Sequence, residues 1–134
     1  MLDKIYNDEI GKLILRSSVG ILMLFHGLAK MMHPGSLDFI GSNLSSIGLP
    51  SAFSYAVYIG EVIAPVMIVA GFHARVGAML IIINMIFAVG LVHTGDIFSI
   101  TMHGGWAIEL QAFYLFGGLS ILFLGSGKLA VKPD

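Results

Sequence analysis

The stretch SAFSYAVYIGEVIAPVMIVAGF, residues 51–72, decides how this chain folds. It is apolar and about as long as the ~20 residues that a helix needs to cross a bilayer, yet Glu61 lies near its centre. A carboxylate at that depth costs about 2.5–3.5 kcal/mol on insertion scales, so we expect it to face the protein interior. Pro65 follows four residues later and cannot donate to the carbonyl of Glu61. A neighbouring helix, water or a ligand must therefore hydrogen-bond both the Glu61 carboxylate and the Glu61 backbone carbonyl.

The rest of the chain is equally apolar. Of its 134 residues, 57% are hydrophobic and 11% are charged, against about 25% charged in an average soluble domain. Four apolar segments cover approximately residues 13–32, 51–72, 74–93 and 104–125. The first is too long for the hydrophobic part of a signal peptide, so we expect it to remain as a span. The sequence predicts an all-α membrane protein, a four-transmembrane-helix bundle in one domain, 1–134.

Composition excludes cysteine chemistry and gives no support to nucleic-acid binding. The chain has no cysteine, which excludes disulfides, thiolate metal sites and iron–sulfur ligation. The net charge is −1 and no basic cluster is present, so we expect the lipid bilayer, and not a nucleic acid, as the main partner.

The basic residues predict the orientation in the membrane. In a four-span bundle, six of the seven fall on one side, and only Lys30 lies toward the other. The six are Lys4, Lys12, Arg16, Arg75, Lys128 and Lys132. Because basic residues accumulate on the cytoplasmic side, we expect both termini in the cytoplasm of a multi-pass protein of the inner (plasma) membrane.

The connections between spans are unequal. The turn at His73 is tight, so residues 51–72 and 74–93 should form antiparallel neighbouring helices. In the first outer loop, apolar residues recur at helical spacing between Leu37 and Ile47, and Ser36 is a candidate N-cap. This pattern predicts a short amphipathic helix, on the outer membrane surface or folded over the bundle as a lid.

Polar side chains gather in the outer half of the predicted bundle. The candidate binding residues are His26, Lys30, Tyr58, Glu61, His93 and Glu109. His26 and Lys30 share one helical face, and so do Tyr58 and Glu61. We expect a polar pocket open to the outside, with His26, Lys30 and Glu61 as the candidate catalytic groups.

Each of these residues also has a structural interpretation. Lys30 can extend to the outer headgroups, and His93 can be an ordinary interfacial residue. Glu61 can pair with His26 or Lys30 only to fix helix register. Asn84 is more typical of a hydrogen bond between helices than of a ligand contact.

Several kinds of site are not supported by the residue spacing. No helix carries the H-E-x-x-H pattern, and neither Glu61 nor Glu109 has a histidine three residues later. Histidines of different helices, with the Met102-His103 pair, could still hold copper, but methionine is plentiful here and no metal site is predicted. A cation, an imidazole and a carboxylate facing an apolar cavity instead suit a quinone, whose ring would be buried and whose oxygens would meet the polar groups.

The chain resembles the DoxX family of small four-span membrane proteins. The resemblance covers essentially the whole chain and depends on an ordered set of short motifs. They are Arg16 and Gly20, His26-Gly27-x-x-Lys30, Gly60-Glu61, Gly71-Phe72-x-x-Arg75, His93, Glu109 and Gly125-Ser126-Gly127.

This resemblance implies residence in the bacterial inner membrane and an association with redox chemistry. The family takes its name from the small subunit of a thiosulfate:quinone oxidoreductase, and other members are linked to oxidative-stress complexes. The resemblance implies that the protein interacts with a quinone as a component of a redox or stress-response system and is an oxidoreductase subunit. Its expected protein partner is a redox protein or a second copy of itself. Two alternatives stay open: a non-enzymatic membrane adaptor or assembly factor, and a small transporter or metal-handling protein.

Overall fold

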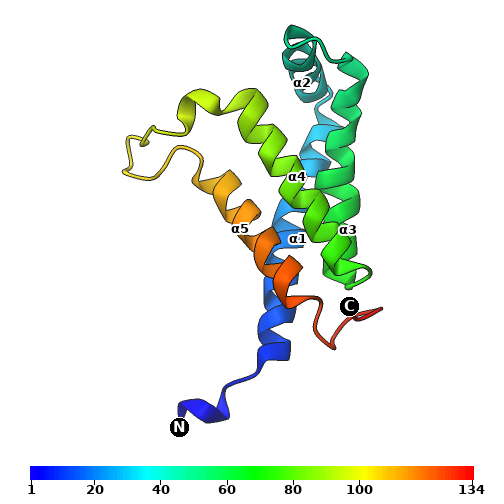
Figure 1. The fold of residues 1–134 in the computed structure, drawn as a ribbon, viewed down its shortest axis with the longest axis vertical. Coiled ribbons are helices and arrows are strands. Elements are labelled where there is room, and N and C mark those ends of the chain that lie inside the picture. The colour runs from blue at the N-terminus through cyan, green and yellow to red at the C-terminus, as the bar shows by residue number, and fades with distance from the viewer.

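The computed structural model describes all 134 residues, and they form helices joined by turns, with two isolated β-bridges and no strands (Figure 1). The elements in chain order are η1 (Leu2–Lys4), α1 (Asp8–Met32), α2 (Gly35–Ser46), η2 (Ser51–Ala56), η3 (Ile59–Ile63), α3 (Ala64–Ala70), α4 (Ala74–Val92), η4 (Thr94–Asp96) and α5 (Glu109–Leu124). Three helical segments are long and apolar enough to cross a membrane: Asp8–Met32, Ser51–Ala70 and Ala74–Val92. The fourth apolar helix, α5, is shorter.

Helix α1 begins at Asp8, earlier than the predicted residue 13. The Asn7 side chain caps it by accepting a hydrogen bond from the Ile10 N–H at 3.1 Å, and Asp8 and Glu9 lie where the helix dipole favours acidic groups. Lys12 Nζ lies 3.2 Å from the Asp8 carboxylate. The polar first turn is therefore helical although it is not part of the apolar segment.

The decisive segment, Ser51–Ala70, is helical but not a single α-helix. It begins as the 3₁₀ helix η2, continues as a π-helical turn over Ile59–Ile63, and becomes α-helical only in α3. In the π turn the Ala64 N–H donates to the carbonyl of Ile59, five residues earlier. Pro65 explains this irregularity, because it lacks an N–H and its ring crowds the carbonyl of residue i−4, which is Glu61.

The tight turn between α3 and α4 is confirmed. Gly71 adopts φ = 73° and His73 adopts φ = 50°, and the N–H groups of Gly71 and Phe72 both donate to the carbonyl of Met67. This bonding closes the end of α3 as in a Schellman motif. Helices α3 and α4 then run antiparallel against each other (Figure 1).

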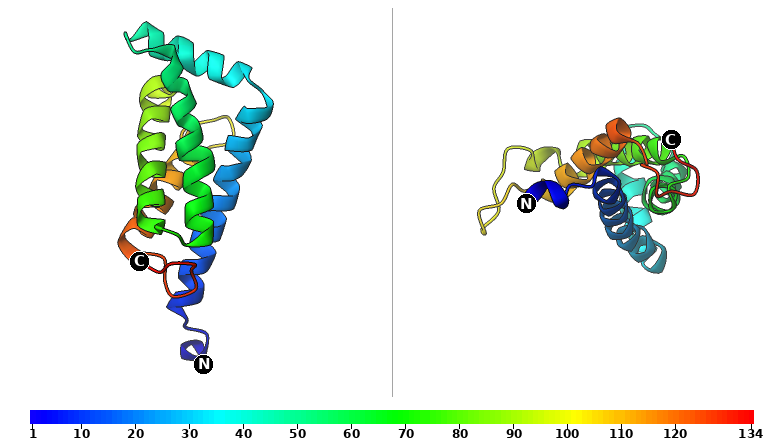
Figure 2. Two further views of the ribbon diagram at one scale, coloured as in Figure 1. Left: turned by 90° about the vertical axis from the view of Figure 1, so that its right-hand side faces the viewer. Right: turned by 90° about the horizontal axis from the view of Figure 1, so that it is seen from below.

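The segment after α1 forms the helix α2, which lies across one end of the bundle (Figure 2). The predicted cap is wrong: Pro34 is the N-cap, no side chain caps the helix, and Ser36 lies within it. Proline is well suited to a helix start because its fixed φ matches the helix and no N–H is lost there. Leu37 and Leu44 are buried on the inner side of α2.

Helix α5 begins at Glu109 and not at residue 104. A turn precedes it: Gly104 adopts φ = 86°, the Thr101 N–H donates to the Gly105 carbonyl at 2.7 Å, and the Trp106 indole N–H donates to the Ile97 carbonyl at 2.6 Å. These bonds hold residues 99–107 in a non-helical hairpin. His103 is consequently exposed on a loop and does not start the helix.

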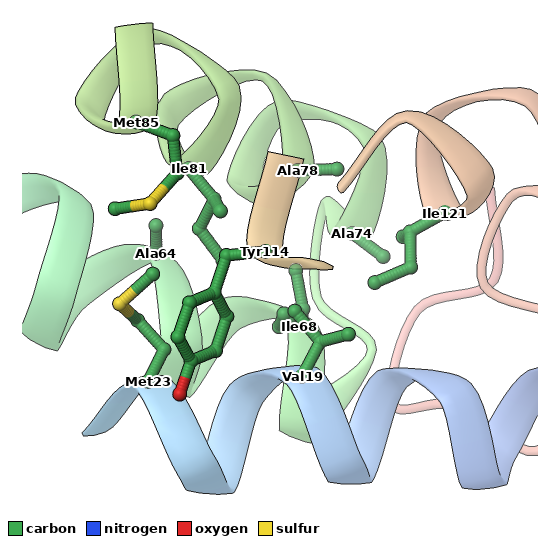
Figure 3. Packing of buried hydrophobic residues seen from close by; sticks show 10 residues of the cluster. All are labelled: Val19, Met23, Ala64, Ile68, Ala74, Ala78, Ile81, Met85, Tyr114 and Ile121. Atoms are coloured by element: carbon green, nitrogen blue, oxygen red, sulfur yellow. The ribbon is translucent and has the colours of Figure 1, made fainter. Parts of the chain in front are cut away.

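The buried core lies where α1, α3, α4 and α5 meet, as the close view in Figure 3 shows. Both termini and the α3–α4 turn lie at one end of the molecule, and α2 lies at the other (Figure 1). At the terminal end, the guanidinium of the buried Arg16 donates to the carbonyls of Ile68, at 3.0 Å, and of Leu129. The C-terminal tail is thereby tied to α1 and α3.

Candidate functional site

A cavity of about 1000 Å³ lies in the half of the bundle nearer α2. Its wall comes from α1, α2, the 51–63 segment, α4 and α5, and 18 of its 28 lining residues are hydrophobic. The polar groups in the wall are few, and they include His26, Lys30, Glu61, His93 and Tyr114. A largely apolar cavity with a few convergent polar groups is typical of a small-molecule site.

Glu61 is the centre of a buried polar cluster in this wall. Its side chain is 4% exposed, and its Oε2 lies 2.5 Å from Lys30 Nζ, which comes from α1. The other carboxylate oxygen, Oε1, accepts a hydrogen bond from Asn84 Nδ2 of α4 at 3.1 Å. Two neighbouring helices, α1 and α4, thus satisfy both oxygens of the carboxylate. The opposite charges of Lys30 and Glu61 leave the cluster without net charge.

Two glycines allow the helices to come this close. A Cβ atom built on Gly27 would lie 2.2 Å from the backbone oxygen of Glu61, so the carbonyl that Pro65 frees faces the bare backbone of α1. A Cβ on Gly60 would lie 2.5 Å from the Cβ of Asn84. Both distances are impossible for a real side chain. Gly27 therefore brings Lys30 to Glu61, and Gly60 brings Asn84 to it.

His26 lines the same cavity one helical turn before Lys30. Its imidazole meets the ring of Tyr114, from α5, edge to face, with centroids 5.7 Å apart and planes at 88°. Such edge contacts are favourable for aromatic rings. This contact joins α1 to α5 across the cavity wall.

His93 ends α4 and also lines the cavity. Its Nδ1 lies 3.1 Å from Asp96 Oδ2, and its Nε2 lies 3.3 Å from the side-chain nitrogen of Gln111 on α5. An imidazole with an N–H on Nδ1 fits both contacts, because it donates to the carboxylate and accepts from the amide. His93 is thus already hydrogen-bonded on both ring nitrogens.

Two of the predicted binding residues do not reach the cavity. The hydroxyl of Tyr58 donates to the backbone carbonyl of Lys30 at 3.5 Å, and its ring is not part of the cavity wall. Glu109 is exposed at the first turn of α5, with its carboxylate directed toward Gly105. Glu109 lies at the end of its helix because the helix starts late, as described above.

Gln111 and Tyr114 contribute to the wall although sequence reasoning did not select them. They are three residues apart and so share one face of α5. A polar residue three positions from a tyrosine in an otherwise apolar helix was the available signal. It is weak, because a buried tyrosine in such a helix is usually a core residue, and Tyr114 is indeed packed in the core (Figure 3).

The sequence is similar to known proteins. Residues 11–94, from α1 through the end of α4, match the DoxX family profile. The chain is also 31% identical over 128 residues to a protein of Bacillus subtilis (strain 168) named "Putative oxidoreductase CatD", covering 93% of this chain and 87% of that protein. No solved structure matches it. The matched region contains the Gly27, Lys30, Gly60 and Glu61 positions that build the polar cluster, and the chain belongs to the DoxX family of membrane proteins.

Proposed function

We propose that this protein binds a quinone in the cavity and acts as a component of a membrane redox or oxidative-stress system. The observation that carries the proposal is the charge-neutral Lys30–Glu61–Asn84 cluster in the wall of a largely apolar cavity of about 1000 Å³. That volume is at the upper end of ordinary ligand pockets, which hold about 300–1,000 Å³. The name of the Bacillus subtilis relative, an oxidoreductase, is consistent with this assignment.

The redox role requires a partner in this proposal. The chain has no cysteine and hence no thiol couple of its own. We therefore place it as the quinone-binding subunit, with electrons exchanged through a partner redox protein. His26, Lys30 and Glu61 form the polar part of the wall around the proposed ligand site, with His93 at its outer edge. Tyr58 lies outside the cavity wall, and we assign it no part in ligand binding.

Direct binding tests the proposal. Purified protein in lipid nanodiscs should bind 2-methyl-1,4-naphthoquinone saturably and at about one equivalent, measured by equilibrium dialysis against empty nanodiscs. This quinone alkylates thiols, but a chain without cysteine gives no such adduct. Binding no greater than that of empty nanodiscs would contradict the proposal and leave a membrane adaptor as the better interpretation. A full equivalent of histidine-bound metal in the purified protein would favour a metal-handling role instead.

We also propose a topology with four crossings, residues 1–134 forming one domain, in the bacterial inner membrane. Helix α5 has 16 residues and is about 24 Å long at 1.5 Å per residue, a few Å short of the ~30 Å hydrocarbon core, and local thinning of the bilayer accommodates such a short span. The termini are assigned to the cytoplasm from the basic residues near them, and α2 to the outer membrane surface above the cavity.

A cysteine placed on α2 should report this topology. Ser45→Cys introduces a single exposed thiol, and we expect an impermeant maleimide to label it in intact cells. Lys128→Cys, on the exposed tail at the opposite end, is the matched control and should be labelled only after permeabilisation. The reverse pattern would invert the assigned orientation.

A further inference from the structure

Tyr114 carries a polar group that the fold does not use. The residue is 8% exposed and packs among the apolar core residues, and Figure 3 shows its hydroxyl pointing toward α1. No hydrogen bond is formed by this hydroxyl within the protein, although the residue lines the cavity. The hydroxyl is not fully enclosed, so it can reach a molecule in the cavity, and a phenylalanine would supply the same packing without this donor.

The charged side chains of the wall and His93 are already hydrogen-bonded. Lys30 is paired with Glu61, and Glu61 has both oxygens bonded. His93 is bonded to Asp96 and Gln111. His26 is the exception: its ring touches Tyr114 but its nitrogens make no hydrogen bond. On the facing helices α1 and α5, the donors left for a ligand are therefore the Tyr114 hydroxyl and the His26 imidazole. Gln111 Oε1 is also unpaired but can only accept, and the hydroxyls of Ser36 and Ser54 come from other segments of the wall.

The charge of the wall indicates what kind of ligand fits. Lys30 and Glu61 neutralise each other at 2.5 Å, so the cavity offers no unpaired charge to an anion or a cation at this place. A phenol and an imidazole can each donate a hydrogen bond to an oxygen atom. A neutral ring compound that carries an oxygen substituent matches both groups and the apolar lining.

We propose that Tyr114, with His26 beside it, is the residue pair that hydrogen-bonds an oxygen of a neutral, lipid-soluble ring compound in the cavity. Lys30 and Glu61 hold α1 and the 51–63 segment in register and do not contact that oxygen. This inference rests on the proposed quinone function and deepens it, because it assigns the ligand contact to a residue of α5 outside the region of the family match.

A pair of ligands that differ only in their oxygens tests the assignment. Tyr114→Phe should weaken binding of 2-methyl-1,4-naphthoquinone about tenfold, the effect of one lost hydrogen bond. It should leave binding of 2-methylnaphthalene within about twofold, because the ring contacts are retained. Tyr58→Phe is the matched control: it removes a hydroxyl outside the cavity and should change neither affinity.

An infrared measurement gives a second readout that a purely structural role would not move. A hydrogen bond lowers the carbonyl stretching frequency of the bound quinone, so this band should return toward its value in apolar solvent in Tyr114→Phe but not in Tyr58→Phe. Equal loss of both ligands in Tyr114→Phe would overturn the assignment and show a packing role. Unchanged quinone affinity and frequency would overturn it as well, while leaving the proposed function intact. Failure of the wild-type protein to bind the quinone would refute the proposed function itself.

Discussion

Lys30→Met is expected to destabilise the folded protein by about 3–5 kcal/mol, the usual cost of removing one partner from a buried ion pair. The methionine keeps most of the apolar stem of Lys30 but leaves Glu61, whose side chain is 4% exposed, without its cation. Asn84 alone cannot compensate the charge, since it donates one hydrogen bond to one oxygen. Thermal and denaturant unfolding in detergent or nanodiscs would measure the loss.

Glu61→Gln should cost less than Lys30→Met. Lys30 is 25% exposed, so its ammonium can reach toward the headgroups when its partner is neutral. The glutamine still fills the site and can hydrogen-bond Asn84. We expect a loss of about 1–3 kcal/mol, typical of a perturbed buried hydrogen bond.

A double variant measures how strongly Lys30 and Glu61 stabilise each other. Lys30→Met with Glu61→Gln removes both charges, so it should be more stable than Lys30→Met alone and give a coupling energy of about 0.5–3 kcal/mol. Lys128→Met, at an exposed position, is the control and should change stability by less than about 0.5 kcal/mol. Strict additivity of the two single changes would mean that the pair does not stabilise the bundle.

Quinone binding by the same double variant shows whether Lys30 and Glu61 contact the ligand or only stabilise the bundle. If the pair only sets register, the double variant should recover both stability and quinone binding. If the cluster contacts the ligand directly, the double variant should recover stability and remain impaired in binding. The second outcome would mean that Lys30 and Glu61 contact the ligand, and that Tyr114 only packs in the cavity wall.

Much of the fold was predictable from local patterns. Glu61 and Pro65 in one apolar stretch predicted a carboxylate and a free backbone carbonyl that need partners at one place in a helix. In the structure Glu61 is bonded on both carboxylate oxygens, and the π turn found there was not predicted. A pairing of Glu61 with Lys30 was one of the structural alternatives that the sequence left open. The tight turn at His73 followed from the short connection alone.

The rest depended on contacts between distant residues. The late start of α5 comes from the Trp106 bond to Ile97, which hydropathy does not report. Gln111 and Tyr114 face the cavity only because α5 packs beside α1 and α4. The prediction that Glu109 lines the pocket requires a helix that starts at residue 104, whereas α5 begins at Glu109. The depth of a side chain in the bundle can be predicted from sequence only when the first residue of its helix is known.

Gly27→Ala is expected to be the most damaging change of a single methyl group in this protein. The added Cβ would lie 2.2 Å from the backbone oxygen of Glu61 and 2.7 Å from its carbonyl carbon. Overpacking usually costs about 1–3 kcal/mol, and this contact is with backbone atoms that no rotamer change can move. Helix α1 must therefore shift away from the 51–63 segment, and Lys30 must draw back from Glu61. We expect reduced thermal stability and at least tenfold weaker naphthoquinone binding.

The decisive part of this prediction is that Gly27→Ala lowers the stability of the protein and does not raise it. An alanine in a helix is intrinsically better than a glycine by about 0.8–1.0 kcal/mol, so propensity alone would make Gly27→Ala stabilising. Gly11→Ala is the matched control in the same helix α1, because nothing lies within 4 Å of the Cβ it would add, and it should be neutral or stabilising. Opposite signs for the two changes would show that close approach to the Glu61 carbonyl is what position 27 requires. Equal, favourable effects would mean that α1 does not contact the carbonyl freed by Pro65, and the geometry that brings Lys30 to Glu61 would lose its physical basis.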